Sequence, residues 1–428
     1  MPRYECRVAR IDTDITTFWM LSRMSWVATK LYNTALWSSR KTWDETGNIP
    51  SGFELHKVVL ASNFRKLVHT HTAQAQADTV GEAYRSWYTL RKKDVTARPP
   101  GFRPRNKGST FTYTVAGFKA LENNAHFRLS LGSELKETLN YPNKFLTLAV
   151  RWNTPFPADG TVKEISIVPR KGHFELHAKI MLPEPKWKTE GQIVAVDLGQ
   201  RNPMACADET EKLDIYKGGG ILELRRYWNK ETSRVKREVM GRSKGKKRNS
   251  NALVRMSQKA AGQINHAIHA LSSEFVENCV SRKVKEVVVG KLKGIKKKKD
   301  GTGKNWNDIG NQNWQQFPLR KLVAQVEYKL ARHGIRLVEQ DEKDTSKGRC
   351  SVCGCTDRKK IHRVHRGLFQ CENCGTTQNA DTNGARNQLA RYLHREVPLE
   401  ISTGSSGALA APSVYRWDGY RWSTAVVA

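Results

Sequence analysis

The spacing of apolar residues predicts a helical and then a strand-rich region in the first half of the chain. MPRYECRVAR alternates as a strand does, and from Thr13 to Lys93 apolar residues recur at helical spacing. Prolines and a glycine in PPGFRP end the helical pattern, and strand-like runs follow. These runs are Phe127 to Leu131, Phe145 to Trp152, Glu164 to Val168 and His173 to Leu182.

The second half alternates buried strands with helices, which predicts an α/β layer. QIVAVD is an apolar run that ends at Asp197, VKEVVVG is a second run, and HGIRLVEQDE resembles a third. The Ser/Gly/Ala/Pro-rich end of the chain predicts a loosely held tail, in which only YRWDGYRW is suited to packing. The helical patterns are Ile221 to Arg282, Leu319 to His333 and Asn379 to Tyr392.

Charge indicates the class of partner. The chain has 73 Lys and Arg against 41 Asp and Glu, a net charge of +32, so a polyanion is the expected partner. The basic runs RSKGKKRN and KLKGIKKKK suit loops that follow phosphates. A proline-stiffened loop makes four cations candidates for nucleic-acid contacts: Arg98, Arg103, Arg105 and Lys107.

The pattern predicts no membrane partner. No apolar run approaches the roughly 20 residues of a spanning helix, and no secretory signal opens the sequence. We therefore expect a soluble, intracellular protein.

Four of the eight cysteines predict a zinc site. Cys350-x-x-Cys353 and Cys371-x-x-Cys374 are separated by 17 residues, the spacing of a zinc ribbon, and a glycine follows each second cysteine. Four thiolates fill a tetrahedral shell, so the predicted Zn²⁺ is structural rather than catalytic. The nearby residues left outside this shell are Cys355, His362 and His365.

Two other groups of side chains are better explained by packing than by binding. Tyr84, Trp87 and Tyr88 have the spacing of a buried helix face, although aromatic side chains also stack on bases. His266 and His269 share a helix face, but no third ligand lies at a zinc-like offset. We predict packing positions for both groups.

Two aspartates are placed as ligands of catalytic metal ions. Nucleases that use two Mg²⁺ ions need several carboxylates around a gap of about 4 Å. Asp197 ends an apolar strand and precedes Gly199, which permits a tight turn, and Asp381 opens the last helix. The alternative for each is a capping role at a loop or a helix N-terminus.

The order of four motifs resembles one known family. IVAVDLGQRNPMACA, TSKGRCSVCG, FQCENCG and NADTNGARNQL look like the RuvC-like nuclease of TnpB proteins and of the compact type V CRISPR effectors. The resemblance is tightest from Gly191 to Leu393, and YNTALW and ARPPGFRPRNKGSTFTY extend it weakly forward. It implies a prokaryotic, cytoplasmic and nucleoid-associated protein whose partners are a guide RNA and double-stranded target DNA. Whether one copy or a homodimer holds each guide RNA stays open.

The resemblance also implies the architecture, a multidomain α+β protein. A helical recognition lobe and a β-barrel-like wedge module precede an RNase H-like (RuvC) α/β nuclease domain with an inserted zinc ribbon. The predicted segments are 1–12 for the first wedge strand, 13–93 for the recognition lobe, 94–190 for the wedge, 191–346 and 379–395 for the nuclease domain, 347–378 for the target-nucleic-acid-binding zinc insert, and 396–428 for the tail.

The resemblance assigns two of three catalytic acids directly. Asp197 matches the first catalytic aspartate and Asp381 the last, but Gly290 stands where the family usually has a glutamate. Either cleavage is lost, or an acid from the neighbouring strand supplies the ligand, because neighbouring strands lie only about 4.8 Å apart. Some family members carry a glutamate in the DE-x-x-TSK setting, which favours Glu342. Less favoured acids are Asp341, Glu327 and Glu286.

Three functions compete at this point. The leading one is an RNA-guided DNA endonuclease with structural Zn²⁺ and catalytic Mg²⁺, which cuts beside a short flanking motif. Gly290 favours the second, a nuclease-inactive RNA-guided DNA-binding protein. The third is a zinc-ribbon transposition accessory protein that binds DNA without a guide and purifies free of stoichiometric RNA.

Overall fold

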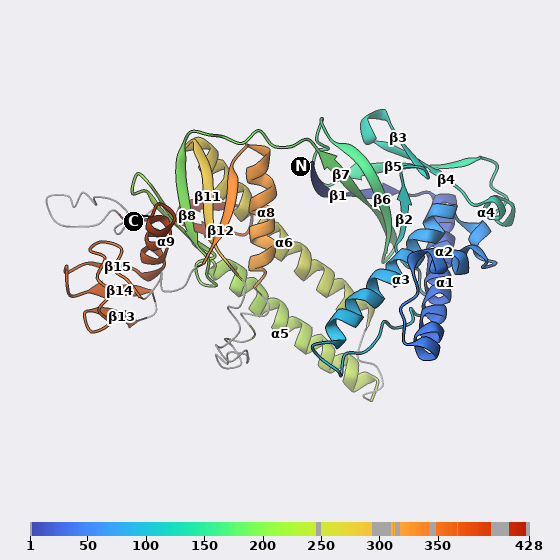
Figure 1. The fold of residues 1–428 in the computed structure, drawn as a ribbon, viewed down its shortest axis with the longest axis horizontal. Coiled ribbons are helices and arrows are strands. Elements are labelled where there is room, and N and C mark those ends of the chain that lie inside the picture. The colour runs from blue at the N-terminus through green and yellow to red at the C-terminus, as the bar shows by residue number, and fades with distance from the viewer. Residues whose placement is uncertain are drawn as a thin grey trace. The chain divides into compact units, whose positions relative to one another are not determined.

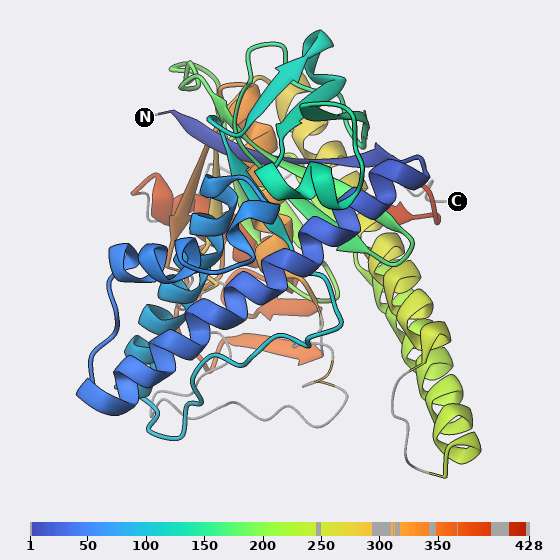
Figure 2. The ribbon, with the colours of Figure 1, turned by 90° about the vertical axis from the view of Figure 1, so that its right-hand side faces the viewer.

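The computed structural model describes most of the chain as two compact units, Met1–Glu184 and Pro185–Ala428 (Figures 1 and 2). Within the described ranges no helix is long and apolar enough to cross a membrane. Glu342 and most of both predicted basic runs lie outside these ranges. The structure describes residues 2–244, 250–292, 310, 312, 317–341, 348–365, 367–394 and 411–424.

In the first unit, helices pack on a nearly closed, barrel-like antiparallel sheet with the order β2-β6-β7-β1-β5-β4-β3. Its strands are β1 (Arg3–Asp12), β2 (Phe111–Thr114), β3 (Phe118–Leu121), β4 (His126–Ser130), β5 (Phe145–Trp152), β6 (Thr161–Arg170) and β7 (His173–Leu182). Its helices are α1 (Ile15–Thr46), α2 (Gly52–Leu60), α3 (Thr70–Arg91) and α4 (Ser133–Thr138), with short 3₁₀ turns η1 (Arg65–Leu67) and η2 (Glu122–Asn124).

One core joins the helices of this unit to its sheet. Met24 and Leu31 of α1 belong to the same buried cluster as Leu148 of β5 and Ile180 of β7. The predicted recognition lobe and wedge are therefore packed together in one unit, which ends at Glu184. The pattern missed β2 and β3, because strands of four residues are too short for a clear alternation.

The aromatic residues of α3 divide between core and surface. Tyr84 and Trp87 are 1% and 6% exposed, as predicted, whereas Tyr88 is 40% exposed. Trp87 packs edge-on against Trp43 of α1, and its indole Nε1 donates to the Ala97 carbonyl over 3.0 Å. The prediction of a core position is thus wrong only for Tyr88.

The second unit is built on a mixed sheet with the order β12-β11-β8-β9-β10-β16-β17. A separate three-stranded sheet consists of β13 (Ile361–His365), β14 (Leu368–Cys371) and β15 (Thr377–Asn379). The strands of the large sheet are β8 (Gln192–Asp197), β9 (Met204–Asp208), β10 (Leu213–Lys217), β11 (Val284–Gly290), β12 (Arg336–Gln340), β16 (Ser413–Trp417) and β17 (Trp422–Thr424). The helices of this unit are α5 (Gly219–Arg242), α6 (Asn251–Ser281), α8 (Leu319–Arg332) and α9 (Ala380–Tyr392).

Both faces of the large sheet are covered, which explains why its strands are continuously apolar. Val194 and Val196 of β8 belong to the buried cluster that includes residues of α6 and α8. Ala195, on the opposite face, packs with Leu389 of α9. Figure 1 shows α6 and α8 together beside β11 and β12, with α9 beside β8.

The helical pattern predicted from Ile221 to Arg282 forms two helices. α5 ends at Arg242 and α6 begins at Asn251, with Ser250 as its N-cap. Figure 2 shows the two helices side by side, and Trp228 of α5 donates through Nε1 to Gln263 of α6 over 2.7 Å. Gly241 in the last turn of α5 and Ser243, its C-cap, weaken helix propensity where the first helix ends.

The predicted loose tail is wrong for residues 411–424, its described part, because they pack on the large sheet. β16 pairs in parallel with β10, and Tyr415 stacks on Tyr216 with ring centroids 4.5 Å apart. Trp422 is 3% exposed and donates through Nε1 to the Ala267 carbonyl over 3.0 Å. This pairing covers β10, which would otherwise present unpaired backbone groups at an edge of the sheet. YRWDGYRW is thus packed, as predicted, but as part of the large sheet.

Candidate functional site

Parallel strands bring several chain segments to one edge of the large sheet. β8, β10, β11, β12 and β16 all run in the same direction, because β9 is antiparallel to both β8 and β10 and the other pairings are parallel. Carboxyl ends of parallel strands are where ligands bind in open α/β sheets. The residues that end these strands are Asp197, Lys217, Gly290, Gln340 and Trp417.

The tight turn after Asp197 leaves no room for a side chain at position 199. A Cβ on Gly199 would lie 2.8 Å from the Asn202 carbonyl oxygen, so a larger residue cannot occupy this position without a shift. The turn folds Asn202 back, where its side chain is 7% exposed. Glycine is thus required here by a close approach of the backbone.

Asp381 does not cap the last helix. The N-cap of α9 is Asn379, whose side-chain oxygen accepts from the backbone N–H groups of Asp381 and Thr382 over 2.9 and 3.4 Å. The Asp381 carboxylate instead accepts from Asn202 Nδ2 over 2.6 Å and lies 3.5 Å from Arg363 Nη2. Its carboxylate is therefore held towards the loop that follows β8.

Asp197 and Asp381 line one pocket of about 1070 Å³. Two carboxylates from a strand end and a helix start suit a hard divalent cation such as Mg²⁺, which prefers oxygen ligands. Glu223 of α5 is a third acid on this wall. Five cations share the lining and would attract a polyanion. They are Arg201, Lys217, Arg226, Arg363 and Arg416.

The acids considered as replacements for the missing glutamate lie elsewhere or outside the described residues. Gly290 pairs with Gln340, so β11 ends beside β12 as expected. Asp341 follows β12 and is exposed, Glu327 is exposed on α8, and the Tyr392 hydroxyl donates to Glu286. Among the described residues, the acids that line the pocket are Asp197, Glu223 and Asp381.

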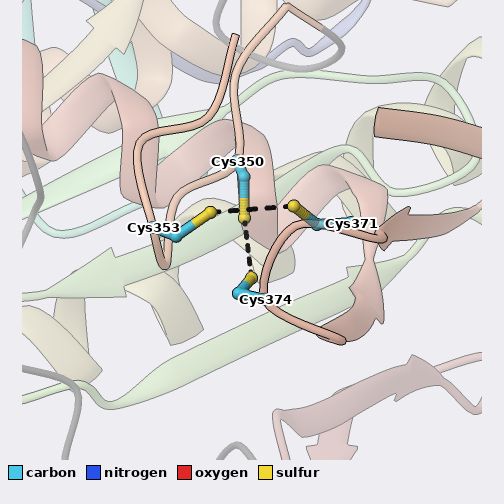
Figure 3. Close-up of side chains that lie close together, drawn as sticks. All are labelled: Cys350, Cys353, Cys371 and Cys374. Carbon is cyan, nitrogen blue, oxygen red and sulfur yellow. Dashed lines mark hydrogen bonds between the residues drawn. The ribbon is translucent and has the colours of Figure 1, made fainter. Parts of the chain in front are cut away.

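The four predicted cysteines form a cluster suited to hold a metal ion (Figure 3). Cys350 Sγ lies 3.8 Å from Cys374 Sγ, and Cys353 Sγ lies 3.7 Å from Cys371 Sγ. Four sulfurs about 2.3 Å from a central Zn²⁺ in a tetrahedron stand about 3.8 Å apart, so the cluster fits zinc. In the described part of the chain it is the one cluster of three or more His, Cys, Asp or Glu suited to a metal ion.

The residues predicted to lie outside the zinc shell do so where the structure describes them. Cys355 is not part of the cluster, and its carbonyl accepts from the Cys350 N–H over 2.9 Å. His362 Nε2 lies 3.0 Å from Glu372 Oε1. The side chain of His365 lies outside the described residues.

Polar side chains of α9 attach the insert that carries the cysteine cluster to the large sheet. Asn383 accepts from the Ser351 N–H over 2.9 Å and donates to the Arg349 carbonyl over 3.0 Å. Arg386, 1% exposed, donates to Gln378 Oε1 and to Glu211 Oε2, both over 2.7 Å. The NADTNGARN motif therefore positions both Asp381 and the insert that carries Arg363.

We expect Arg386→Leu to lower the stability of the second unit by about 3 kcal/mol, because it leaves Gln378 and Glu211 without their buried partner. Thermal unfolding and hydrogen exchange of α9 measure the change. Arg234→Ala is the matched control, since that arginine is ion-paired but exposed, and surface pairs contribute about 0–1 kcal/mol. Equal stability of the two variants would contradict a structural role for Arg386.

The candidate nucleic-acid loop is held along α1. Asn33 accepts from the Arg103 N–H and donates to the Arg103 carbonyl, both over 2.9 Å. The Arg103 guanidinium lies 3.6 Å from the centre of the Tyr32 ring and donates to Gln76 over 3.2 Å. Arg103 is thus engaged within the unit, whereas three of the predicted cations are exposed: Arg98, Arg105 and Lys107.

Of the two histidines of α6, His269 is partly buried, as expected of a packing residue, whereas His266 is exposed, so the predicted packing position is wrong for His266. The His266 ring packs edge-on against Trp417 at 5.6 Å. Burial, and secondarily the charge of Lys329, lowers the pKa of His269 to about 4. Lys329 Nζ donates to the His269 carbonyl over 2.7 Å, and burial lowers its own pKa to about 8.

Comparisons with known proteins find similarity over parts of this chain. The model of the Cas12f1-like TNB domain matches residues 320–388, and that of the OrfB_IS605 probable transposase matches residues 175–296. The CRISPR-associated endodeoxyribonuclease Cas12f1 of Sulfoacidibacillus thermotolerans is 38% identical over 86 residues, and the match spans 19% of each chain.

The fold agrees with these sequence matches. A cryo-EM structure of a Cas12f1–sgRNA–target DNA complex aligns with a TM-score of 0.55 and 16% identity, over 87% of this chain and 82% of that one. The predicted α+β architecture, with a barrel-like sheet and an inserted cysteine cluster, is thereby confirmed. The two domain matches occur in the order of the predicted motifs. The matched segments and the overall fold are thus similar to those of TnpB proteins and compact type V CRISPR effectors.

Proposed function

We propose that this protein is an RNA-guided DNA endonuclease. The observation that carries the proposal is the pocket in which Asp197 and Asp381 meet amid five cations. Paired carboxylates suit Mg²⁺, and the surrounding cations suit a phosphodiester backbone. The Cas12f1 relative is described as an endodeoxyribonuclease, and the aligned solved complex contains sgRNA and target DNA.

Each residue of the pocket has a distinct task in this proposal. Asp197 and Asp381 would hold Mg²⁺, which supplies activation of water and neutralisation of charge on the leaving oxygen. Asn202 orients the Asp381 carboxylate through its 2.6 Å hydrogen bond. Arg363, from the zinc insert, presents a cation 3.5 Å from the same carboxylate and contacts the phosphate backbone.

The rest of the chain supplies nucleic-acid contacts in this proposal. Arg98, Arg105 and Lys107 contact phosphates of guide RNA or duplex DNA, since they are exposed on a loop that is fixed along α1. The helices and barrel of the first unit hold the guide RNA and the flanking duplex, and the zinc insert contacts target DNA.

The first test is the purified protein with its co-purified RNA. We expect an absorbance ratio typical of a ribonucleoprotein and Mg²⁺-dependent cleavage of a plasmid library that carries the guide's target beside randomised flanking sequences. RNA-free protein that binds DNA would instead support a zinc-ribbon accessory protein. Tight target binding without cleavage would support the nuclease-inactive reading, which Gly290 at the end of β11 favours.

We expect Glu342→Ala to lower cleavage at least about 100-fold, because Glu342 would supply the metal ligand that Gly290 cannot. The comparison variants are Glu223→Ala, which removes the acid on the pocket wall, and Asp341→Ala, its neighbour. Single-turnover cleavage under saturating protein measures each variant. A large loss of cleavage in Glu223→Ala alone would show that Glu223 of α5, rather than Glu342, supplies the third metal ligand.

A further inference from the structure

The end of the chain forms one wall of the nuclease pocket. β16 runs parallel to β10, so its carboxyl end reaches the same edge of the sheet as Asp197. Arg416 and Trp417, the last two residues of β16, line the pocket. β16 is three strands away from β8, or about 14 Å at the usual strand spacing. Arg416 and Trp417 therefore lie to one side of the two aspartates and not in direct contact with them.

Two like charges stand side by side on this wall. Arg416 pairs in register with Lys217 of β10, and both side chains line the pocket. Like charges in adjacent strand positions destabilise a sheet, so this pair costs stability unless an anion lies between them. Arg226 of α5 adds a third cation to the lining. The arrangement is suited to a phosphate group.

Next to these cations, the Trp417 ring is held in a fixed position. It contacts His266 at 5.6 Å and Trp422 at 5.9 Å between ring centroids. α5 passes so close that a Cβ on Gly220 would lie 3.1 Å from Trp417 Cδ1. The ring is nevertheless only partly buried and lines the pocket. A fixed, accessible indole beside cations is the combination that binds a nucleotide by stacking and charge.

We propose that β16 forms a subsite for a nucleotide next to the scissile phosphate of a single DNA strand. Trp417 stacks on the base, and Arg416 with Lys217 binds its phosphate. The inference rests on the proposed nuclease function and adds a positioning role to it. Because stacking does not read base identity, the subsite accepts any sequence.

Photocrosslinking tests the subsite without cleavage. The probe is oligothymidylate with one 5-iodouracil, which crosslinks to aromatic side chains on irradiation. It is added to the Asp197→Ala ribonucleoprotein, so that the strand stays intact. We expect the crosslinked peptide to contain Trp417, and the yield to fall at least about 5-fold in Arg416→Ala. Arg421→Ala is the matched control, because that arginine is an exposed cation of the same hairpin and is not among the pocket residues.

Cleavage by the variants separates a positioning role from a role in packing alone. We expect Trp417→Ala to slow cleavage of bound target about 5- to 100-fold, with Trp417→Phe closer to wild type and target binding unchanged in both. Thermal unfolding identifies any variant that fails to fold, and Arg416→Ala, an exposed position, keeps the test valid in that case.

Different results would contradict the nuclease function and the nucleotide subsite. If wild type cleaves, but no crosslink reaches Trp417 and Arg416→Ala cuts at the wild-type rate, the subsite is overturned and the nuclease stands. If wild type never cleaves but the crosslink to Trp417 forms, the nuclease fails while the strand-binding subsite is supported.

Discussion

Asp197→Ala and Asp381→Asn are expected to reduce DNA cleavage by at least about 100-fold while target binding is retained. Both residues line the same pocket, and each would supply a carboxylate to Mg²⁺. Loss of groups that merely orient a metal ligand already costs about 10- to 100-fold, so loss of a ligand itself costs more. Asparagine at 381 keeps the shape of the side chain and an oxygen that accepts from Asn202.

Cleavage and binding are measured on the same ribonucleoprotein. Single-turnover rates at saturating Mg²⁺ report cleavage, and filter binding in the presence of Ca²⁺ reports the target complex. Asp44→Ala, an exposed acid on α1, is the control for loss of one negative charge. Wild-type cleavage rates in either pocket variant would remove that residue from the site, and parallel loss of binding would indicate damage to the fold.

Cys371→Ser is expected to release zinc and to unfold the insert. The four sulfurs are arranged for one Zn²⁺, and binding of a structural zinc contributes about 10 kcal/mol or more to folding. Because the insert carries Arg363 to Asp381, cleavage should fall together with zinc content. Metal analysis should find one zinc per wild-type chain and less in the variant.

Cys355→Ser is the matched control, since this cysteine lies outside the cluster. It should keep the zinc and the cleavage rate. Equal zinc content in Cys371→Ser and wild type would contradict the assignment.

Acid should also release the zinc. Zinc binds deprotonated thiolates, so protons compete with the metal for the four sulfurs as the pH falls. We therefore expect the zinc content, measured against pH, to be constant above neutrality and to fall on the acid side.

The sequence alone was sufficient to predict the features that depend on residues close together along the chain. The Cys-x-x-Cys spacing determined the zinc cluster, because each pair closes within one turn and only two turns need to meet. The apolar run QIVAVD determined that Asp197 ends a buried strand, since a strand covered on both faces admits few polar residues. The same reasoning found α8 and α9 within one residue of their bounds.

Only the tertiary structure revealed the contacts between residues that are far apart in the sequence. Asn202 and Arg363 reach Asp381 from segments 179 and 18 residues away, and no spacing in the sequence relates them. β16 joins β10 across about 200 residues, and its Ser/Gly/Ala/Pro-rich surroundings resemble a loose tail. Strand pairing is decided by backbone groups that any sequence carries, so composition does not reveal the partner. The wall formed by Arg416 and Trp417 therefore exists only in the folded sheet.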